Sequence, residues 1–140
     1  MSEKYFVDTN ILIYAHDYRA GQKHQRAQQL IQGLWESGAG VLSTQILQEI
    51  CVNFRRKVDP PLQTDEVRRL IEDYSNWEVV INSPESIVEA LEIELRYKIS
   101  FWDALVLQAA EQAGAAILYS EDLAEGQNYG SLRVVNPFTG

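Results

Sequence analysis

The stretch YFVDTNILIYAH, from Tyr5 to His16, decides the fold that we predict for this chain. Lys4 to Val7 is predicted to be a short buried strand, because aromatic and β-branched residues follow one another. Thr9 to about Asp17 is typical of a helix. Asp8 lies between them, so its carboxylate is either a helix N-cap or part of a functional site. The stretch alone leaves both readings open.

The composition is that of one globular domain spanning residues 1–140. The chain is 46% hydrophobic and 23% charged, and its length is enough to bury about two-thirds of the unfolded surface. The single cysteine, Cys51, excludes an internal disulfide and fits a reducing compartment. No apolar run approaches the ~20 residues that span a bilayer, and MSEKYFVD lacks the features of a signal peptide. We therefore expect a soluble, cytoplasmic protein without membrane contact.

The charge balance weakens a nucleic-acid reading without excluding it. The formal net charge is −8, whereas a strongly basic domain would indicate a nucleic-acid partner. Acidic residues that cluster around divalent cations reverse the local field, however. No CxxC or paired-histidine spacing suggests a structural zinc site.

Strand and helix signals alternate along the rest of the chain, separated by glycine and proline breaks. The expected helices are Gln22–Ser37, one capped by Ser43 or Thr44 and carrying Ile46, Leu47, Ile50 and Phe54, then Thr64–Ser75, Ser83–Lys98 and Ser100–Ala113. The expected strands are Val41–Leu42, Trp77–Ile81, Ala115–Tyr119 and Leu132–Val135. This alternation predicts an α/β layered domain with a mainly parallel sheet. Ligands of such sheets bind beyond the carboxyl ends of the strands, where Asp8, Ser43 and Ser120 fall.

Four acidic positions, Asp8, Glu49, Asp103 and Asp122, are candidates for a site there. Each has a structural alternative: an N-cap for Asp8, a solvated helix position for Glu49, a capping box with Ser100 for Asp103, and a polar turn for Asp122. Asp8 and Asp122 follow strands, and the other two lie early in helices, so all four can point into one crevice. Carboxylates that meet there would repel one another. Mg²⁺ or Mn²⁺, which prefers oxygen ligands, removes that repulsion.

These segments resemble the PIN domain and, within it, the VapC-type toxin ribonucleases of bacteria and archaea. The matching stretches are FVDTNILIYA (Phe6–Ala15), STQILQEI (Ser43–Ile50), YKISFWDALVLQAA (Tyr97–Ala110) and LYSEDLAEGQ (Leu118–Gln127), with VVNPF (Val134–Phe138) similar to the last strand. The resemblance implies a three-layer α/β/α sandwich with a central parallel sheet, and an acidic pocket that binds Mg²⁺ or Mn²⁺ and cleaves single-stranded RNA. It also implies a homodimer and a small antitoxin that covers the cleft.

The resemblance assigns roles to the four acids. Asp8 is the acid after the first strand, Glu49 that of the third-helix motif, Asp103 that of the WDA motif, and Asp122 that of the S-x-D turn. Our hypothesis is that Asp8 and Asp103 hold the main metal. Glu49 and Asp122 then complete the site, ligate a second ion, or position the attacking water.

Polar neighbours of these acids are expected to orient the carboxylates or a water. These are Thr9, Asn10 and Ser120. Glu121 is ambiguous, because it either shares the work of Asp122 or faces solvent.

A basic run, Arg55-Arg56-Lys57, follows Glu49. It is either a solvated helix end, favourable with the helix dipole, or a grip for RNA phosphates.

The other conspicuous side chains are interpreted structurally. His16 and His24 lack an accompanying nucleophile and are expected at the surface or core edge. The aromatic residues Tyr97, Phe101 and Trp102 are expected to pack against other side chains rather than stack on bases.

The leading function is thus a metal-dependent endoribonuclease, the toxin of a toxin–antitoxin pair. A phosphatase of the haloacid dehalogenase type needs a second Asp two residues after the first, and that position is Asn10. A non-catalytic PIN-like RNA-binding or scaffolding module is the other alternative, against which the presence of all four acids argues.

Overall fold

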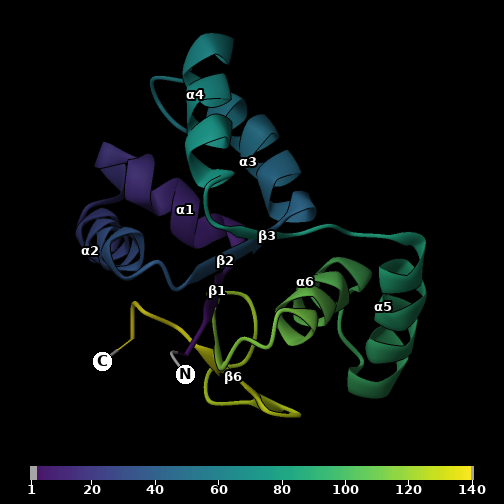
Figure 1. The fold of residues 1–140 in the computed structure, drawn as a ribbon. Coiled ribbons are helices and arrows are strands. Elements are labelled where there is room, and N and C mark those ends of the chain that lie inside the picture. The colour runs from purple at the N-terminus through teal and green to yellow at the C-terminus, as the bar shows by residue number, and fades with distance from the viewer. Residues whose placement is uncertain (1–2, 140) are drawn as a thin grey trace.

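A computed structural model describes residues 3–139, and Figure 1 shows how the elements are arranged. The helices are α1 (Thr9–His16), α2 (Gln22–Ser37), α3 (Thr44–Arg56), α4 (Thr64–Tyr74), α5 (Pro84–Tyr97) and α6 (Phe101–Gln112), with a short 3₁₀ helix η1 (Tyr18–Ala20). The strands are β1 (Tyr5–Val7), β2 (Gly40–Ser43), β3 (Glu78–Val80), β4 (Ile117–Tyr119), β5 (Asn128–Tyr129) and β6 (Leu132–Val135).

The six strands form one sheet in the order β3-β2-β1-β4-β6-β5. All neighbours pair in parallel except β5 and β6, which are antiparallel. The chain builds outward from β1 through β2 to β3, then returns to the other side of β1 with β4. The order of strands therefore reverses between β1 and β4, and a crevice opens at such a reversal, beyond the carboxyl ends of the strands.

Helices cover the sheet on both faces. The α1–α2 pair and the α5–α6 pair lie on opposite sides of the central strands, while α3 and α4 pack together next to α1 (Figure 1). The central strands supply fully buried side chains such as Phe6, Leu42 and Leu118, and α3 adds Ile46 and Ile50. Burying apolar residues of this size supplies most of the driving force for folding. The predicted α/β fold with a mainly parallel sheet is confirmed.

The predicted elements are also confirmed, with small differences at their ends. β2 begins one residue earlier than predicted, at Gly40, where a Cβ would lie 2.5 Å from the Trp77 ring. Glycine is required at position 40 because any side chain would collide with this ring. Gly40 therefore belongs to the strand, although sequence patterns treat a glycine here as a break. The short elements η1 and β5 were not predicted, because three-residue and two-residue segments carry too little periodicity. No helix within residues 3–139 is long and apolar enough to span a membrane.

Candidate active site

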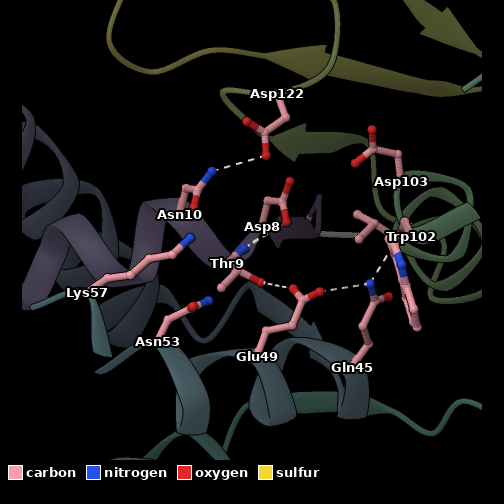
Figure 2. A pocket seen from close by; sticks show the side chains of 11 residues that line it. Asp8, Thr9, Asn10, Gln45, Glu49, Asn53, Lys57, Trp102, Asp103 and Asp122 are labelled. Atoms are coloured by element: carbon pink, nitrogen blue, oxygen red, sulfur yellow. Dashed lines mark hydrogen bonds between the residues drawn. The ribbon is translucent and has the colours of Figure 1, made fainter. Parts of the chain in front are cut away.

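The four predicted acids line one cleft of about 440 Å³ at the crevice between β1 and β4. They come from four separate segments: Asp8 follows β1, Asp122 follows β4, Glu49 lies on α3, and Asp103 lies at the start of α6 (Figure 2). The other residues that line this acidic cleft are Thr9, Asn10, Gln45, Asn53, Lys57, Trp102 and Val106. The cleft thus gathers four carboxylates against one lysine ammonium.

Asp8 is the deepest of the acids and is only 6% exposed. Its Oδ1 accepts a hydrogen bond from the backbone N–H of Thr9 (2.8 Å), and its Oδ2 accepts one from Ser120 Oγ (2.9 Å). An ordinary N-cap accepts from the second or third helical residue, whereas Asp8 accepts from the first, so capping alone does not explain its placement. Burial, reinforced by the charges of Asp122 and Glu49 and opposed by the two hydrogen bonds, raises the pKa of Asp8 to about 7.

Ser120 connects Asp8 to Asp122. It is fully buried, and the Oγ that donates to Asp8 also accepts from the backbone N–H of Asp122 at 3.2 Å. Asn10 Nδ2 donates to Asp122 Oδ2 at 3.1 Å, and Thr9 Oγ1 donates to Glu49 Oε1. Each of the three predicted orienting residues therefore contacts one of the acids.

Asp103 and Glu49 complete the walls of the cleft. Asp103 is half-buried, and this burial, together with the charges of Asp122 and Glu49, raises the pKa of its carboxyl. The second oxygen of Glu49 accepts from Gln45 Nε2 (3.3 Å), which also donates to the backbone carbonyl of Trp102 (3.2 Å). Buried Gln45 thus joins the acid of α3 to the start of α6, while its Oε1 has no partner among the described residues.

The polar side chains of α3 form a stripe that the sequence analysis missed. Gln45, Glu49 and Asn53 follow one another at intervals of four residues, Lys57 continues the series, and all four line the cleft. An i, i+4 spacing places residues on one helix face, so this periodic polar row was the available signal. Of the predicted basic run, only Lys57 lines the cleft; Arg55 and Arg56 are exposed, and Arg55 Nε donates to the carbonyl of Cys51 in its own helix (2.7 Å).

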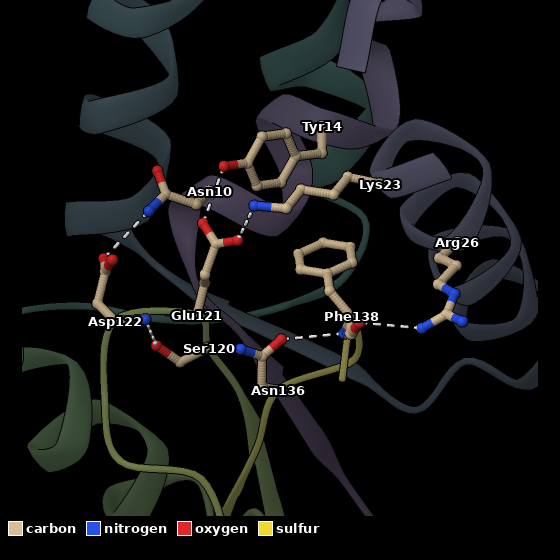
Figure 3. A network of polar contacts seen from close by, with 9 residues as sticks. All are labelled: Asn10, Tyr14, Lys23, Arg26, Ser120, Glu121, Asp122, Asn136 and Phe138. Carbon is tan, nitrogen blue, oxygen red and sulfur yellow. Dashed lines mark hydrogen bonds and ion pairs between the residues drawn. The ribbon is translucent and has the colours of Figure 1, made fainter. Parts of the chain in front are cut away.

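Glu121 points away from the cleft, into a contact network shown in Figure 3. Its carboxylate accepts from Tyr14 Oη (2.8 Å) and forms an ion pair with Lys23 Nζ. Lys23 Nζ also lies 5.0 Å from the centre of the Tyr14 ring. Burial raises the pKa of Glu121, but the bonds from Lys23 and Tyr14 outweigh it, so the pKa lies below its ordinary value. We call Tyr14, Lys23 and Glu121 the Glu121 anchor.

The histidines and the aromatic residues were expected to have structural roles. His16 is at the core edge, as expected, with Nε2 2.8 Å from Tyr74 Oη, and neither histidine is among the residues that line the cleft. Tyr97 packs against Tyr129 with ring centres 4.7 Å apart. The Trp102 ring packs edge-on against Phe101, but the residue is 62% exposed and stands at the edge of the cleft, so its packing leaves much of the ring uncovered.

The donor set of the cleft fits a hard divalent cation. Within residues 3–139, no three His, Cys, Asp or Glu side chains lie close enough together to hold an ion between them. Mg²⁺ does not need such a cage, because it keeps several waters and takes one or two carboxylates. A buried carboxylate with a raised pKa, facing other carboxylates, is a site where a cation relieves electrostatic cost.

Comparison with protein families gives one match: a family model described as the PIN domain matches residues 5–124. A sequence comparison with curated proteins finds no significant match.

Solved structures with similar folds come from toxin–antitoxin systems. VapC20 of Mycobacterium tuberculosis, a sarcin-ricin loop cleaving toxin, is 20% identical with a TM-score of 0.67, over 85% of this chain and 90% of that one. A toxin–antitoxin complex from Klebsiella pneumoniae is 19% identical with a TM-score of 0.68, over 96% and 98%. VapBC2 of Rickettsia felis, bound to a DNA fragment from its promoter, is 19% identical with a TM-score of 0.62, over 93% and 96%. At these identities the likeness concerns the fold.

Proposed function

The chain belongs to the PIN domain family, and from this premise we propose that it is a metal-dependent endoribonuclease that cleaves single-stranded regions of RNA. We propose further that residues 1–140 act as one domain and that the protein is the toxin of a type II toxin–antitoxin pair in the cytoplasm. The similar folds of VapC20, a sarcin-ricin loop cleaving toxin, and of the Klebsiella complex support this assignment.

The observation that carries the proposal is the convergence of four carboxylates from four segments in one cleft, whose lining among residues 3–139 includes a single ammonium group, that of Lys57. Such an arrangement costs stability, because like charges repel and a buried carboxylate loses hydration. It is explained if the cleft exists to hold a cation and, through it, an anionic substrate such as a phosphodiester.

Under this proposal Asp8 and Asp103 hold the main Mg²⁺ or Mn²⁺. A bound divalent ion would polarise the phosphoryl oxygens and lower the pKa of a water. Glu49 and Asp122 complete the site, ligate a second ion or position the attacking water, and Thr9, Asn10 and Ser120 fix their orientation by the hydrogen bonds described above. Lys57 contributes a positive charge at the cleft wall for a backbone phosphate of the RNA. Arg55 and Arg56 are exposed and do not line the cleft, so under this proposal they contact phosphates of the RNA outside it.

We propose two protein partners for this chain, an antitoxin and a second copy of the chain itself. VapBC and other toxin–antitoxin complexes among the similar structures support a small antitoxin partner for this chain. A homodimer is supported by an exposed apolar row on α5, where Ile87, Leu91 and Leu95 follow at four-residue intervals and are 44%, 51% and 82% exposed. Contiguous apolar surface of this kind is what homodimer interfaces bury. Sedimentation velocity on the wild type and Leu91→Glu measures this: the variant should lose the dimer.

Two alternatives are less well supported. A haloacid dehalogenase-type phosphatase would need an acid at position 10, but the side chain there is an amide, Asn10, which donates to Asp122. A non-catalytic RNA-binding or scaffolding module leaves the cost of the acidic cleft unexplained.

The decisive experiment incubates the purified protein with total RNA in Mn²⁺, in Mg²⁺, or in chelator, and maps the ends produced. Cleavage at discrete sites should require the ion. Asp8→Asn, which keeps the shape and removes the charge, should abolish it, whereas Glu121→Gln, a carboxylate-to-amide change just outside the cleft, should not. Cleavage at full rate by Asp8→Asn, or persistence of the cuts in chelator, would contradict the proposal.

A further inference from the structure

A groove opens beside the acidic cleft and shares a wall with it. This side groove measures about 390 Å³ and is lined by Gln45, Gln48, Glu49, Val52, Asn53 and Trp102. Four of these six residues, Gln45, Glu49, Asn53 and Trp102, also line the cleft. Its volume lies within the ~300–1,000 Å³ of small-molecule sites. A chain that passes through the cleft therefore meets the groove at once.

Trp102 is the main aromatic surface of this groove. The residue is 62% exposed although indole is strongly apolar. Its position is nevertheless defined: its backbone carbonyl accepts from Gln45 Nε2 (3.2 Å), and its ring packs edge-on against Phe101 with ring centres 5.3 Å apart. A well-held but exposed aromatic ring is preorganised for stacking, since little freedom is lost when a flat ligand covers it.

The chemistry of the lining selects against phosphate and in favour of a base. The described residues that line the groove include no lysine or arginine; their polar side-chain groups are three amides, the carboxylate of Glu49 and the indole N–H of Trp102. Amides read the donor and acceptor edges of a nucleobase, and an aromatic ring stacks on its face. Lys57 lines the cleft but is not among the described residues that line the groove. The cleft has most of the charged groups, and the groove has the amides and the aromatic ring. This division matches a nucleotide, with its phosphate in the cleft and its base in the adjacent groove.

We propose that the side groove binds an unpaired nucleobase of the RNA substrate, stacked on Trp102, with Gln48 and Asn53 at its edge. This inference rests on the proposed ribonuclease function and deepens it. It gives a physical reason for a preference for single strands, because a base in a duplex is already stacked and paired. Stacking is tolerant of base identity, so selectivity among bases comes from the amides.

The test uses a single-stranded RNA oligonucleotide carrying one mapped cut site. Trp102→Ala should raise KM about tenfold with kcat within about twofold, since stacking acts on binding, and Trp102→Phe should restore most of the loss. Tyr18→Ala is the matched control, because Tyr18 is an aromatic residue that is 84% exposed and lines neither the cleft nor the groove. Melting curves of each variant verify that the fold is kept.

A series of oligonucleotides, each with one abasic ribose, locates the base. Loss of the base at one position should raise the KM of the wild type about tenfold. The same oligonucleotide should not change the KM of Trp102→Ala, since that variant already lacks the ring on which the base stacks. Equal KM values for wild type and Trp102→Ala would overturn the inference. So would a change in sedimentation from dimer to monomer in Trp102→Ala with unchanged RNA affinity, because the ring then belongs to a protein interface.

The two proposals fail separately. If the wild type does not cut RNA with Mn²⁺, the ribonuclease function fails. RNA affinity, measured by fluorescence anisotropy in chelator, then still tests Trp102: equal affinity for wild type and Trp102→Ala overturns the groove assignment.

Discussion

Asp122 and Glu121 are neighbours in the chain, but their side chains lie in two regions whose electrostatic environments differ. One region lowers the pKa of a carboxyl group and the other raises it. In the Glu121 anchor the acid receives a hydrogen bond from Tyr14 and an ion pair from Lys23, and its pKa falls. In the acidic cleft Asp8 and Asp103 face other acids, and their pKa values rise. Within the anchor, Tyr14 and Lys23 offset the charge of Glu121. In the cleft, we propose that a bound cation offsets the charges of the acids.

This difference separates a structural role from a functional one. Both regions contact the turn that follows β4. The anchor binds the side chain of Glu121, and Ser120 and Asn10 hydrogen-bond Asp122. The anchor therefore contributes to stability directly and to chemistry only through the position of its neighbour. Under the proposed function, the acids of the cleft contribute to catalysis and lower stability. A mutation in the cleft should therefore reduce activity more than stability, and a mutation in the anchor should reduce stability more than activity.

The largest effect is expected from exchanging one carboxylate in each region for its amide. Asp8→Asn should lower kcat/KM for RNA about 100-fold or more, because several kcal/mol of electrostatic stabilisation are lost. Its melting temperature in chelator should equal or exceed that of the wild type, since a charge penalised by burial is removed. Glu121→Gln should show a lower melting temperature and lose less than about tenfold in kcat/KM. An equal loss of activity in both folded variants would contradict this division.

The next effect concerns the ion itself. Mg²⁺ at 100 times its Kd should raise the free energy of unfolding by about 2.7 kcal/mol, by linkage. Differential scanning fluorimetry at constant ionic strength measures this as a rise in melting temperature. Glu121→Gln should keep the rise and Asp8→Asn should lose most of it. An equal rise in all three proteins would place the ion outside the cleft.

Ser120→Ala should produce an intermediate phenotype, because its Oγ connects Asp8 to the backbone of Asp122. Buried groups left without a partner cost ~1–3 kcal/mol, and loss of an orienting contact costs ~10–100-fold in activity. Ser86→Ala is the matched control: Ser86 is also buried, but its Oγ accepts from the backbone N–H of Ser83 in the capping box of α5, away from the cleft. The Ser86→Ala variant should lose stability but keep its activity. Full activity in Ser120→Ala would show that Asp8 and Asp122 do not need this connection.

How much of the site was predictable depends on how local its determinants are. The strand–Asp8–helix junction follows from a dozen adjacent residues, and the orienting residues Thr9 and Asn10 adjoin it. The fate of Glu121 was not predictable, because its partners Tyr14 and Lys23 lie 107 and 98 residues away. The S-x-D pattern favours Asp122 as the acid of the site, but nothing near position 121 in sequence shows where the Glu121 side chain goes.

The exposure of Trp102 was unpredictable for a related reason. Tryptophan is highly buried on average, and nothing near Trp102 in sequence shows that the start of α6 stands at the edge of a cleft. The role of Lys57 likewise depends on the direction of α3 across the cleft, although the four-residue spacing of Gln45, Glu49 and Asn53 was visible in the chain.

The last effect, and the sharpest in sign, is on the pH dependence of stability in metal-free protein. The pKa of Asp8 rises from 3.8 to about 7 on folding, so between these values the unfolded chain releases a proton that the folded protein keeps. This group therefore makes the wild type progressively less stable as pH rises from 4 to 7, by at most about 1.4 kcal/mol per pH unit. Asp8→Asn lacks this term, so the melting temperature of the wild type should fall relative to the variant over that range.

Glu121 should behave in the opposite way. Its pKa on folding lies below the ordinary 4.5, so its contribution is complete above that pH and is lost as the pH falls through the folded value. The deficit of Glu121→Gln relative to wild type should therefore be constant at neutral pH and shrink below about pH 4.5. Thermal melts of the three proteins across pH 3.5–7.5 in metal-free buffer separate the two trends. Trends of the same sign would mean that the cleft acids are neutralised within the chain, as Glu121 is, and that the cleft does not require a cation.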